Sequence, residues 1–337
     1  MRPAVAIPTL ANSGVAGKKR AAHLQEFLLT GTSPTNFADH WNNSDVRGLL
    51  LAMQSHICAY CALDVRTLDV EHFRPKATIH GEPPGTPGYW WLAYEVSNYF
   101  LGCTECNQRL KGTKFPLLNN ATRVTFATRN RIAGERRLLL DPVEDRDVET
   151  LFHIEWSDQT CELVPAPGLA TAERRRVVDV IDFFNLNLDP IVRKHRSKVY
   201  LDAVKIANDK AWHDLRSVAM RHREHSFAAR FVLQALKQRL PSAEEETQDL
   251  AATQWLVLRG QVKAILDLEG RGETPRPTDI RLMESPCWAL IVLKNHGTAD
   301  QRKAVEELLI RWLGNEQEAA IRDRILRLFG KLSASLP

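Results

Sequence analysis

Four of the six cysteines in this 337-residue chain fall into two C-x-x-C pairs, Cys58 with Cys61 and Cys103 with Cys106. Each pair can present two thiolates from one tight turn, and a tetrahedral structural zinc site needs four such ligands. A thioredoxin-like redox centre instead needs one pair at the start of a helix after a strand, and an iron–sulfur cluster is a further alternative. We expect a structural zinc ion. Four thiolates close its coordination sphere, so any chemistry must lie in other residues.

Further residues whose types could support chemistry lie between and beside the two pairs. Glu71 and His72 are adjacent in an apolar run, and Asn98, Asn107 and Lys111 follow. Each has an ordinary interpretation, because such a histidine is usually a packed core residue, asparagines suit turns and helix caps, and a lone lysine is usually solvated. Their occurrence in this order around two cysteine pairs favours a shared site over independent coincidences.

This order of residues resembles the HNH nuclease family in its four-cysteine, zinc-stapled form. The residues that carry the resemblance are C58-A-Y-C61, D69-V-E-H-F-R-P-K76 and N98-Y-F-L-G-C103-T-E-C106-N107-Q-R-L-K111-G. More closely, the chain is similar to the HNH proteins of Septu-type bacterial anti-phage systems, which are encoded beside an ABC-like ATPase. The resemblance covers about residues 55 to 145. It implies a ββα-metal fold, in which two strands and a helix hold one catalytic divalent ion.

The resemblance gives each candidate residue a role in a metal-dependent endonuclease. Hydrolysis of a phosphodiester bond needs a base that activates water and a cation that stabilises the developing charge. His72 matches the general base, and Glu71 and Asn107 match the positions that hold Mg²⁺ or Mn²⁺. Asn107 stands where the family name has a histidine, so this is an H-N-N version. Asn98 matches the residue that orients the histidine loop, and Lys111, one turn after Asn107, is expected to hold a phosphate oxygen.

Basic residues recur near the candidate site and again further along this chain of formal net charge +4. They favour sequence-independent attraction to phosphates, with a solvated surface as the alternative. The resemblance implies DNA as the substrate, although the residues do not exclude RNA. The basic residues in question are Arg74, Lys76, Arg109, Lys111, Lys114, Arg123, Arg129, Arg131, Arg136 and Arg137, followed by Arg193, Lys194, Arg196 and Lys198.

The order of predicted elements indicates an α+β fold followed by a mainly α-helical domain. Residues 1–155 are expected to form a helical N-terminal arm and an HNH nuclease domain with its core at 55–120, including a short strand at 67–74. A linker at about 155–170 is expected to precede an α-helical domain at 171–337. We expect this second domain to serve partner docking or oligomerisation.

Local signals predict where several elements begin and end. The run RRLLLDPVEDRD, residues 136–147, predicts a strand followed by a turn. Asp189 followed by Pro190 predicts the start of a helix. Thr298 and Gln301 have the spacing of a capping box, and Gly314 is expected to end the helix that they begin.

Composition and pattern narrow the class of protein further. Hydrophobic residues make up 44% of the chain, as in globular proteins, and no run of eighteen apolar residues predicts a membrane span. The N-terminal segment lacks the apolar core of a signal peptide, so we expect a cytoplasmic protein. The expected partners are DNA, an ABC-like ATPase or a second copy of the chain.

A non-catalytic, zinc-stapled nucleic-acid-binding or interaction protein is the alternative function. Glu71 and His72 with Asn107 distinguish the two, because a protein that only binds has no need of a base and a carboxylate beside a metal-facing amide.

Overall fold

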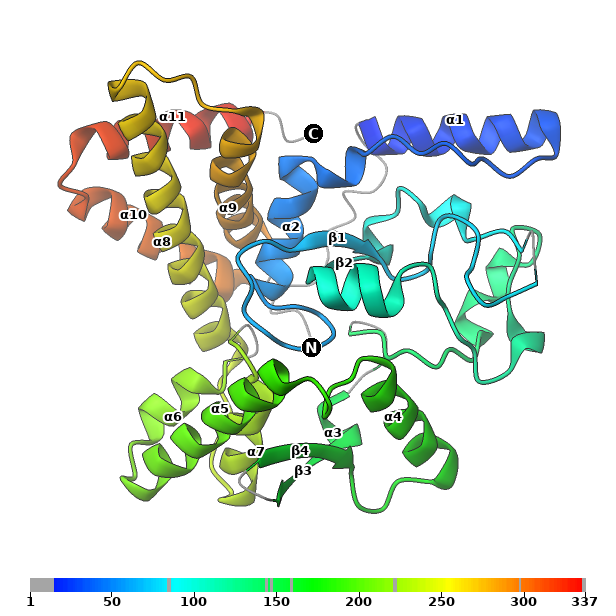
Figure 1. The fold of residues 1–337 in the computed structure, drawn as a ribbon. Coiled ribbons are helices and arrows are strands. Elements are labelled where there is room, and N and C mark those ends of the chain that lie inside the picture. The colour runs from blue at the N-terminus through cyan, green and yellow to red at the C-terminus, as the bar shows by residue number, and fades with distance from the viewer. Residues whose placement is uncertain are drawn as a thin grey trace. The chain divides into compact units, whose positions relative to one another are not determined.

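The computed structural model describes residues 15–83, 86–142, 145, 148–157, 160–220, 223–296 and 298–334. They form two compact units. The first unit contains residues 15–38 and 56–240, and the second contains residues 39–55 and 241–334. The division therefore falls after residue 240 and differs from the boundary expected at 155–170. Figure 1 shows the elements of both units, coloured in chain order.

Residues 155–170, which we expected to be a linker, include most of a β-hairpin. β3 (Phe152–Ser157) pairs with β4 (Thr160–Pro165) in antiparallel register. Ile154 and Cys161 are buried in a common apolar cluster of the first unit. Because a half-buried hairpin needs an apolar residue at only every second position, its sequence looks as polar as that of a linker.

The candidate site lies on a strand–strand–helix segment of the first unit. β1 (Asp69–His72) and β2 (Tyr99–Gly102) form a two-stranded antiparallel sheet (Figure 1). In its register, His72 lies opposite Tyr99. A short helix, η5 (Glu105–Lys111), begins shortly after β2. The antiparallel pairing therefore places the end of β1, which carries His72, beside the start of β2. The helix that follows begins from the other end of the sheet.

An aromatic-rich segment connects the two strands. It forms two short 3₁₀ turns, η3 (Trp90–Leu92) and η4 (Val96–Asn98), and its described residues form no long helix or strand. Tyr89, Trp90 and Trp91 are all buried. Each large aromatic side chain removes a large apolar area from water, so this segment supplies a core that a two-stranded sheet alone lacks.

The remaining elements of the first unit are mostly helices. Asp189 caps α5 by accepting a hydrogen bond from the Ile191 N–H at 2.8 Å, and Pro190 occupies its first turn, which confirms the predicted start. These elements are α1 (Val15–Thr30), η6 (Asn120–Thr122), η7 (Arg129–Gly134), α3 (Val148–Leu151), α4 (Thr171–Phe183), α5 (Pro190–Asn208), α6 (Trp212–Val218) and α7 (Ser226–Ala235).

The strand expected within 136–147 was wrong for the described residues of that range. They pair with another segment only through an isolated bridge from Arg137 to Leu117. The guanidinium of Arg176 donates to the carbonyl oxygens of Leu138 and Leu139, each at 2.9 Å. A side chain from α4 therefore satisfies the carbonyl groups that a strand partner would otherwise bind.

The second unit is helical, and α2 (Ser44–Gln54) packs closely on α9 (Pro277–Asn295). A Cβ atom on Gly48 would lie 2.2 Å from the Cβ of Trp288, so glycine permits this approach of the two helices. The other elements of this unit are η2 (His40–Asn42), α8 (Ala243–Gly270), α10 (Ala299–Asn315) and α11 (Ala319–Ser333).

The predicted capping box of α10 is confirmed, whereas its predicted end is wrong. The Thr298 N–H donates to Gln301 Oε1 at 2.8 Å, and the Gln301 N–H donates to Thr298 Oγ1 at 3.3 Å. The helix continues through Gly314 to Asn315. Among the described helices, none is long and apolar enough to cross a membrane.

Candidate metal centre and active site

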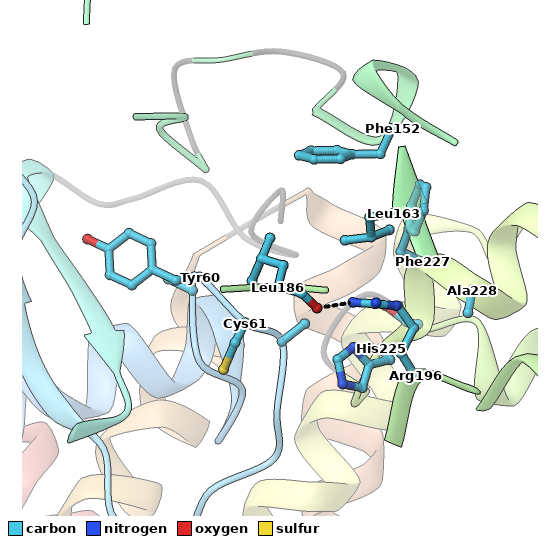
Figure 2. Close-up of a pocket in the computed structure, with 12 residues that line it drawn as sticks. Tyr60, Cys61, Phe152, Leu163, Leu186, Arg196, His225, Phe227 and Ala228 are labelled. Carbon is cyan, nitrogen blue, oxygen red and sulfur yellow. Dashed lines mark hydrogen bonds between the residues drawn. The ribbon is translucent and has the colours of Figure 1, made fainter. Parts of the chain in front are cut away.

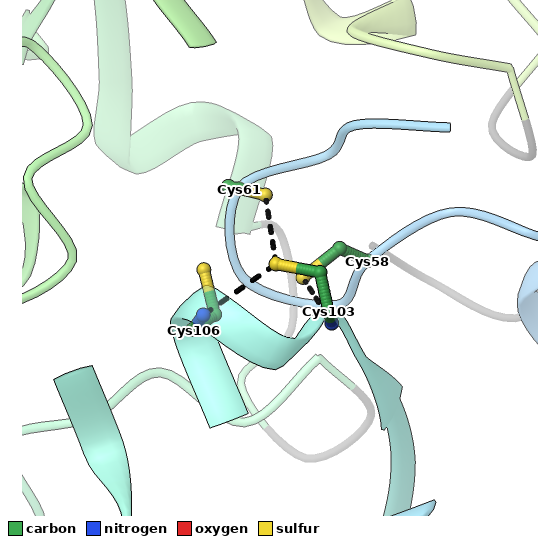
Figure 3. A group of neighbouring side chains, drawn as sticks. All are labelled: Cys58, Cys61, Cys103 and Cys106. Carbon is green, nitrogen blue, oxygen red and sulfur yellow. Dashed lines mark hydrogen bonds between the residues drawn. The ribbon is translucent and has the colours of Figure 1, made fainter. Parts of the chain in front are cut away.

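The four cysteines of the two C-x-x-C pairs gather into one buried cluster (Figure 3). The Sγ atoms of Cys58, Cys61, Cys103 and Cys106 all lie within 4.8 Å of one another, and none of them forms a disulfide. Cys61 Sγ and Cys103 Sγ are 3.8 Å apart. In a tetrahedral site with Zn–S bonds of about 2.3 Å, the sulfur atoms are about 3.8 Å apart. The cluster therefore has both the donor set and the spacing for zinc.

Backbone N–H groups of the second pair point at cysteine sulfurs. The Cys103 N–H donates to Cys58 Sγ at 3.4 Å, and the Cys106 N–H donates to Cys103 Sγ at 3.5 Å. Hydrogen bonds from the neighbouring cysteines, Cys106 foremost, lower the pKa of the Cys103 thiol. Hydrogen bonds with Cys103 in turn raise the pKa of Cys61 and of Cys106. The two backbone N–H groups, which can only donate, favour the thiolate form that metal ligation requires.

The first cysteine turn is also attached to the sheet. The Ala59 N–H donates to the carbonyl oxygen of Leu101 in β2 at 3.0 Å. The turn is closed by an antiparallel bridge between Ile57 and Asp64. A metal ion in the cluster would therefore fix this turn and the start of η5 at one end of the β1–β2 sheet.

His72 lies at the end of β1 and is only 6% exposed. Its Nε2 lies 3.0 Å from the carbonyl oxygen of Ala93, and its ring packs edge-to-face on Tyr99. A carbonyl oxygen can only accept, so Nε2 carries the proton and Nδ1 carries the lone pair. Burial lowers the pKa of His72 to about 3. The imidazole is therefore neutral at pH 7, with its basic atom fixed as Nδ1.

Glu71 is ion-paired inside the protein, and the contact uses only one of its carboxylate oxygens. Lys111 Nζ pairs with Glu71 Oε1, and the hydroxyl of Tyr60 donates to the same atom at 3.2 Å. Among the described residues, Glu71 Oε2 has no hydrogen-bond partner. Burial raises the pKa of Glu71, and Lys111 opposes this shift. Oε2 is consequently the atom through which this carboxylate can reach a further cation.

Lys111 is positioned differently from the phosphate contact that we expected. Its side chain is 0% exposed, and Nζ also donates to the carbonyl oxygen of His72 at 3.0 Å. The wide turn of η5, in which the Gly112 N–H donates to Asn107 O at 2.7 Å, has the i→i+5 spacing of a π-helix. The lysine therefore holds the end of β1 from inside the protein.

Asn107 projects from η5 near Glu71. A Cβ atom on Gly102 would lie 3.3 Å from the Cβ of Asn107 and 3.7 Å from the Cβ of Glu71. The two side chains thus begin on either side of a glycine that leaves space between them. Within the described part of the chain, the side-chain amide of Asn107 makes no hydrogen bond. An oxygen of Asn107 and Oε2 of Glu71 are therefore both available as ligands.

Asn98 is buried and clamps the backbone that follows His72. Its Oδ1 accepts from the Arg74 N–H at 2.8 Å, and its Nδ2 donates to the Arg74 carbonyl oxygen at 2.9 Å. The Phe73 N–H donates to the Asn98 carbonyl oxygen at 2.9 Å. Three hydrogen bonds from one residue therefore fix the two residues after His72.

Two contacts in this site involve groups that the sequence did not single out. The carbonyl oxygen of Ala93 sets the tautomer of His72, and Tyr60 bonds to Glu71 from within the first cysteine turn. Every residue has a backbone carbonyl group, so the amino-acid sequence cannot indicate which one will bond to His72. Only the position of Tyr60 between Cys58 and Cys61 could have drawn attention to it.

Besides Lys111, two further residues that we expected to contact phosphate are buried. Arg74 is 5% exposed, and its Nε donates to buried Glu135 at 3.0 Å. Arg196 is 2% exposed and donates to backbone carbonyl oxygens. Both guanidinium groups are engaged inside the protein. Arg109 and Lys198, whose side chains are each 75% exposed, remain accessible to a polyanion.

Comparison with known proteins gives two curated relatives, both from Bacillus mycoides (strain KBAB4). The chain is 35% identical over 136 residues to Septu protein PtuB, a match that covers 38% of this chain and 44% of PtuB. It is 26% identical over 151 residues to Septu protein PtuA, which covers 42% of this chain and 19% of PtuA. The chain thus spans less than half the length of each relative. No protein-family model and no solved structure matches it.

Proposed function

We propose that this chain is a metal-dependent HNH endonuclease that hydrolyses phosphodiester bonds of DNA in anti-phage defence. One observation carries the proposal: Glu71 Oε2 and the Asn107 amide, both without hydrogen-bond partners among the described residues, belong to side chains that meet at Gly102, and His72 follows Glu71 directly on β1. The end of β1 and η5 thus carry oxygen ligands for a hard cation, and the residue beside one of these ligands is a neutral imidazole. In this proposal, β1, β2 and η5 are the two strands and helix of a ββα-metal fold.

Each residue of the site has one task in the proposed reaction. Bound Mg²⁺ or Mn²⁺ supplies Lewis-acid stabilisation of charge on the phosphate and the leaving oxygen. Glu71 and Asn107 hold this ion, and His72 Nδ1 takes a proton from the attacking water. Asn98 fixes the loop after His72 by its contacts to Arg74. Lys111 positions the carboxylate of Glu71 and the end of β1 and does not touch the phosphate.

The four-cysteine cluster acts as a scaffold in this proposal. Four thiolates around zinc leave no position for water or substrate, so the zinc ion takes no part in hydrolysis. Its contribution is to hold the first cysteine turn, which carries Tyr60, against β2. Loss of zinc would then disturb Glu71 through Tyr60.

The defence role and the partner rest on the similarity to Septu proteins PtuB and PtuA. We assign the chain to a two-component anti-phage system in which an ABC-like ATPase controls the nuclease. The helical second unit provides a surface for that partner or for a second copy of the chain. Co-purification of the chain with a co-expressed Septu-type ABC-like ATPase, or with a second, differently tagged copy of the chain, tests this part. If the chain is a monomer and does not bind the co-expressed ATPase, the proposed role of the second unit is contradicted.

The substrate class is tested with purified protein on supercoiled plasmid, single-stranded DNA and RNA, each with Mg²⁺ or Mn²⁺. We expect DNA cleavage that requires the divalent ion and is lost in Glu71→Gln. Because a nuclease under ATPase control can be silent alone, the assay is repeated with the ATPase present. Cleavage of RNA but not DNA would contradict the substrate, and no cleavage under either condition would contradict the enzyme.

A non-catalytic binding protein is the second candidate, and the Lys111–Glu71 contact favours it. The ammonium already neutralises the carboxylate, and both side chains are buried. Manganese binding separates the two candidates, because a scaffold has no use for a divalent ion at Glu71. Titration of the zinc-loaded protein with Mn²⁺, read by electron paramagnetic resonance, should show one site that Glu71→Gln removes.

A further inference from the structure

A cavity of about 140 Å³ lies beside the first cysteine turn, whose residues Tyr60 and Cys61 form part of its wall (Figure 2). Most of its walls are apolar. They come from the cysteine turn, from both strands of the β3–β4 hairpin and from the start of α7. The lining residues used below are Tyr60, Leu163, Arg196 and His225.

Arg196 places a buried positive charge in the cavity wall. Its guanidinium donates to the carbonyl oxygens of Cys161 and Leu186 and to the side-chain oxygen of Asn187, at 2.8, 2.9 and 2.8 Å. All three acceptors are neutral. Among the described residues, no carboxylate lies within ion-pairing distance of this guanidinium. Glu162 acts on this charge only from beyond ion-pairing distance, and burial lowers the pKa of Arg196. A buried charge without a direct ion pair is costly, so an anion beside Arg196 would be stabilised.

His225 adds an unused polar atom to the same wall. The residue is 4% exposed, and within the described chain its Nε2 is buried without a hydrogen-bond partner. Its backbone has φ 45°, a conformation that only a few residue types adopt readily, and its N–H donates to Ala62 O at 3.1 Å. The backbone contact fixes the position of the residue, and the Nε2 atom of its ring stays available for a ligand. Burial lowers the pKa of His225 to about 3, so the ring does not add a second charge.

We propose that this cavity binds a small organic monocarboxylate with an apolar body, and that the bound anion acts on the candidate active site through Tyr60. The carboxylate pairs with Arg196 and accepts from His225, and the apolar body fills the space beside Leu163. A cavity of about 150 Å³ accommodates a benzene-sized molecule, which sets the size of the ligand. The second step rests on the proposed nuclease function, because Tyr60 lines the cavity and bonds to Glu71.

Binding is tested by isothermal titration of the zinc-loaded full chain with benzoate, in high salt to screen surface charges. Benzamide, which has the same shape but no charge, is the control ligand. Leu163→Trp fills the cavity, and Leu188→Trp, at a position that is 73% exposed, is the matched control variant. We expect benzoate to bind at least tenfold more tightly than benzamide. Leu163→Trp should weaken benzoate at least tenfold and Leu188→Trp less than twofold.

Several results would overturn the site. They are no heat from benzoate at its solubility limit, equal affinity for benzamide, or unchanged affinity in Leu163→Trp. If Leu163→Trp fails to retain zinc or helical signal, Ala59→Leu serves as a second filling variant on another wall.

The proposed action of the bound anion on the active site is tested by DNA cleavage at saturating benzoate, where we expect at least a threefold change in rate. Tight binding of benzoate with an unchanged cleavage rate would contradict the proposed action through Tyr60 but not the binding site. If the chain does not cleave DNA at all, the proposed nuclease function fails, and the measured affinity for benzoate still decides whether the cavity binds a carboxylate.

Discussion

Lys111 Nζ contacts two consecutive residues at the end of β1, the carboxylate of Glu71 and the carbonyl oxygen of His72. The lysine side chain is 0% exposed and that of Glu71 is 5% exposed. A buried ammonium in this position fixes both the proposed metal ligand and the proposed base. It also sets a limit on the site, because a divalent ion must bind Glu71 through the oxygen that Lys111 leaves free.

Replacement of Lys111 by methionine should therefore destabilise the first unit strongly. Removing one partner of a buried ion pair leaves an unpaired charge and costs about 3 kcal/mol or more. Urea denaturation followed by tryptophan fluorescence measures the change. Lys198→Met, at an exposed side chain, is the control and should leave the transition nearly unchanged. A loss for Lys111→Met below about 1 kcal/mol would show that the pair does not form in solution.

Asn98→Ala should loosen the loop after His72 without disturbing the cysteine cluster. The change removes both side-chain hydrogen bonds to Arg74 and leaves buried backbone groups without partners, at a cost of about 2 kcal/mol. We expect faster hydrogen exchange at Phe73 and Arg74, with zinc content unchanged. Protection equal to that of the wild type would mean that other contacts hold this loop.

Removal of zinc should unfold the strand–strand–helix segment. The two cysteine turns meet at the cluster, so a metal ion bound there would contribute folding free energy directly. We expect one zinc per chain in the wild type, and its loss in Cys58→Ser. Cys287→Ser, at a buried cysteine outside the cluster, should keep the zinc. A zinc content of one per chain in both variants would show that the metal does not bind at the four-cysteine cluster.

Gly102→Ala tests the geometry between Glu71 and Asn107. The new Cβ would lie 3.3 Å from the Cβ of Asn107, so this residue must shift by a few tenths of an ångström. Ligand distances in metal sites tolerate only about 0.2 Å, so Mn²⁺ should bind about tenfold more weakly. Gly134→Ala, whose Cβ meets nothing within 4 Å, is the matched control. Equal Mn²⁺ affinity in the two variants would show that Asn107 is not a ligand of the metal.

The parts of the site that sequence could predict are those set by local spacing. Two C-x-x-C turns specify a four-thiolate donor set whatever lies between them, and Cys58 and Cys103 do meet. The capping box at Thr298 is equally local, since its two hydrogen bonds span three residues. Gly314 failed as a helix end because a glycine is tolerated inside a helix when packing sustains it.

The parts that sequence could not predict depend on contacts between distant segments. The spacing of Lys111 from Asn107 fits an exposed helix face, and only the wide turn of η5 and its pairing with β1 place the ammonium inside. Arg196 looks like part of a basic surface until Cys161 and Leu186 supply carbonyl oxygens for it. When backbone carbonyl groups of distant segments accept the hydrogen bonds of a charged side chain, the residues next to it in the sequence do not indicate that it is buried.

The most direct test of the account is plasmid cleavage by the wild type and by His72→Ala, compared at equal zinc content with Mg²⁺ or Mn²⁺ and with the proposed ABC-like ATPase partner present. The account predicts cleavage by the wild type and a loss of at least a hundredfold in His72→Ala, as expected for removal of a general base. Equal cleavage by the two proteins at equal zinc would contradict it, because Nδ1 of His72 would then have no part in the chemistry.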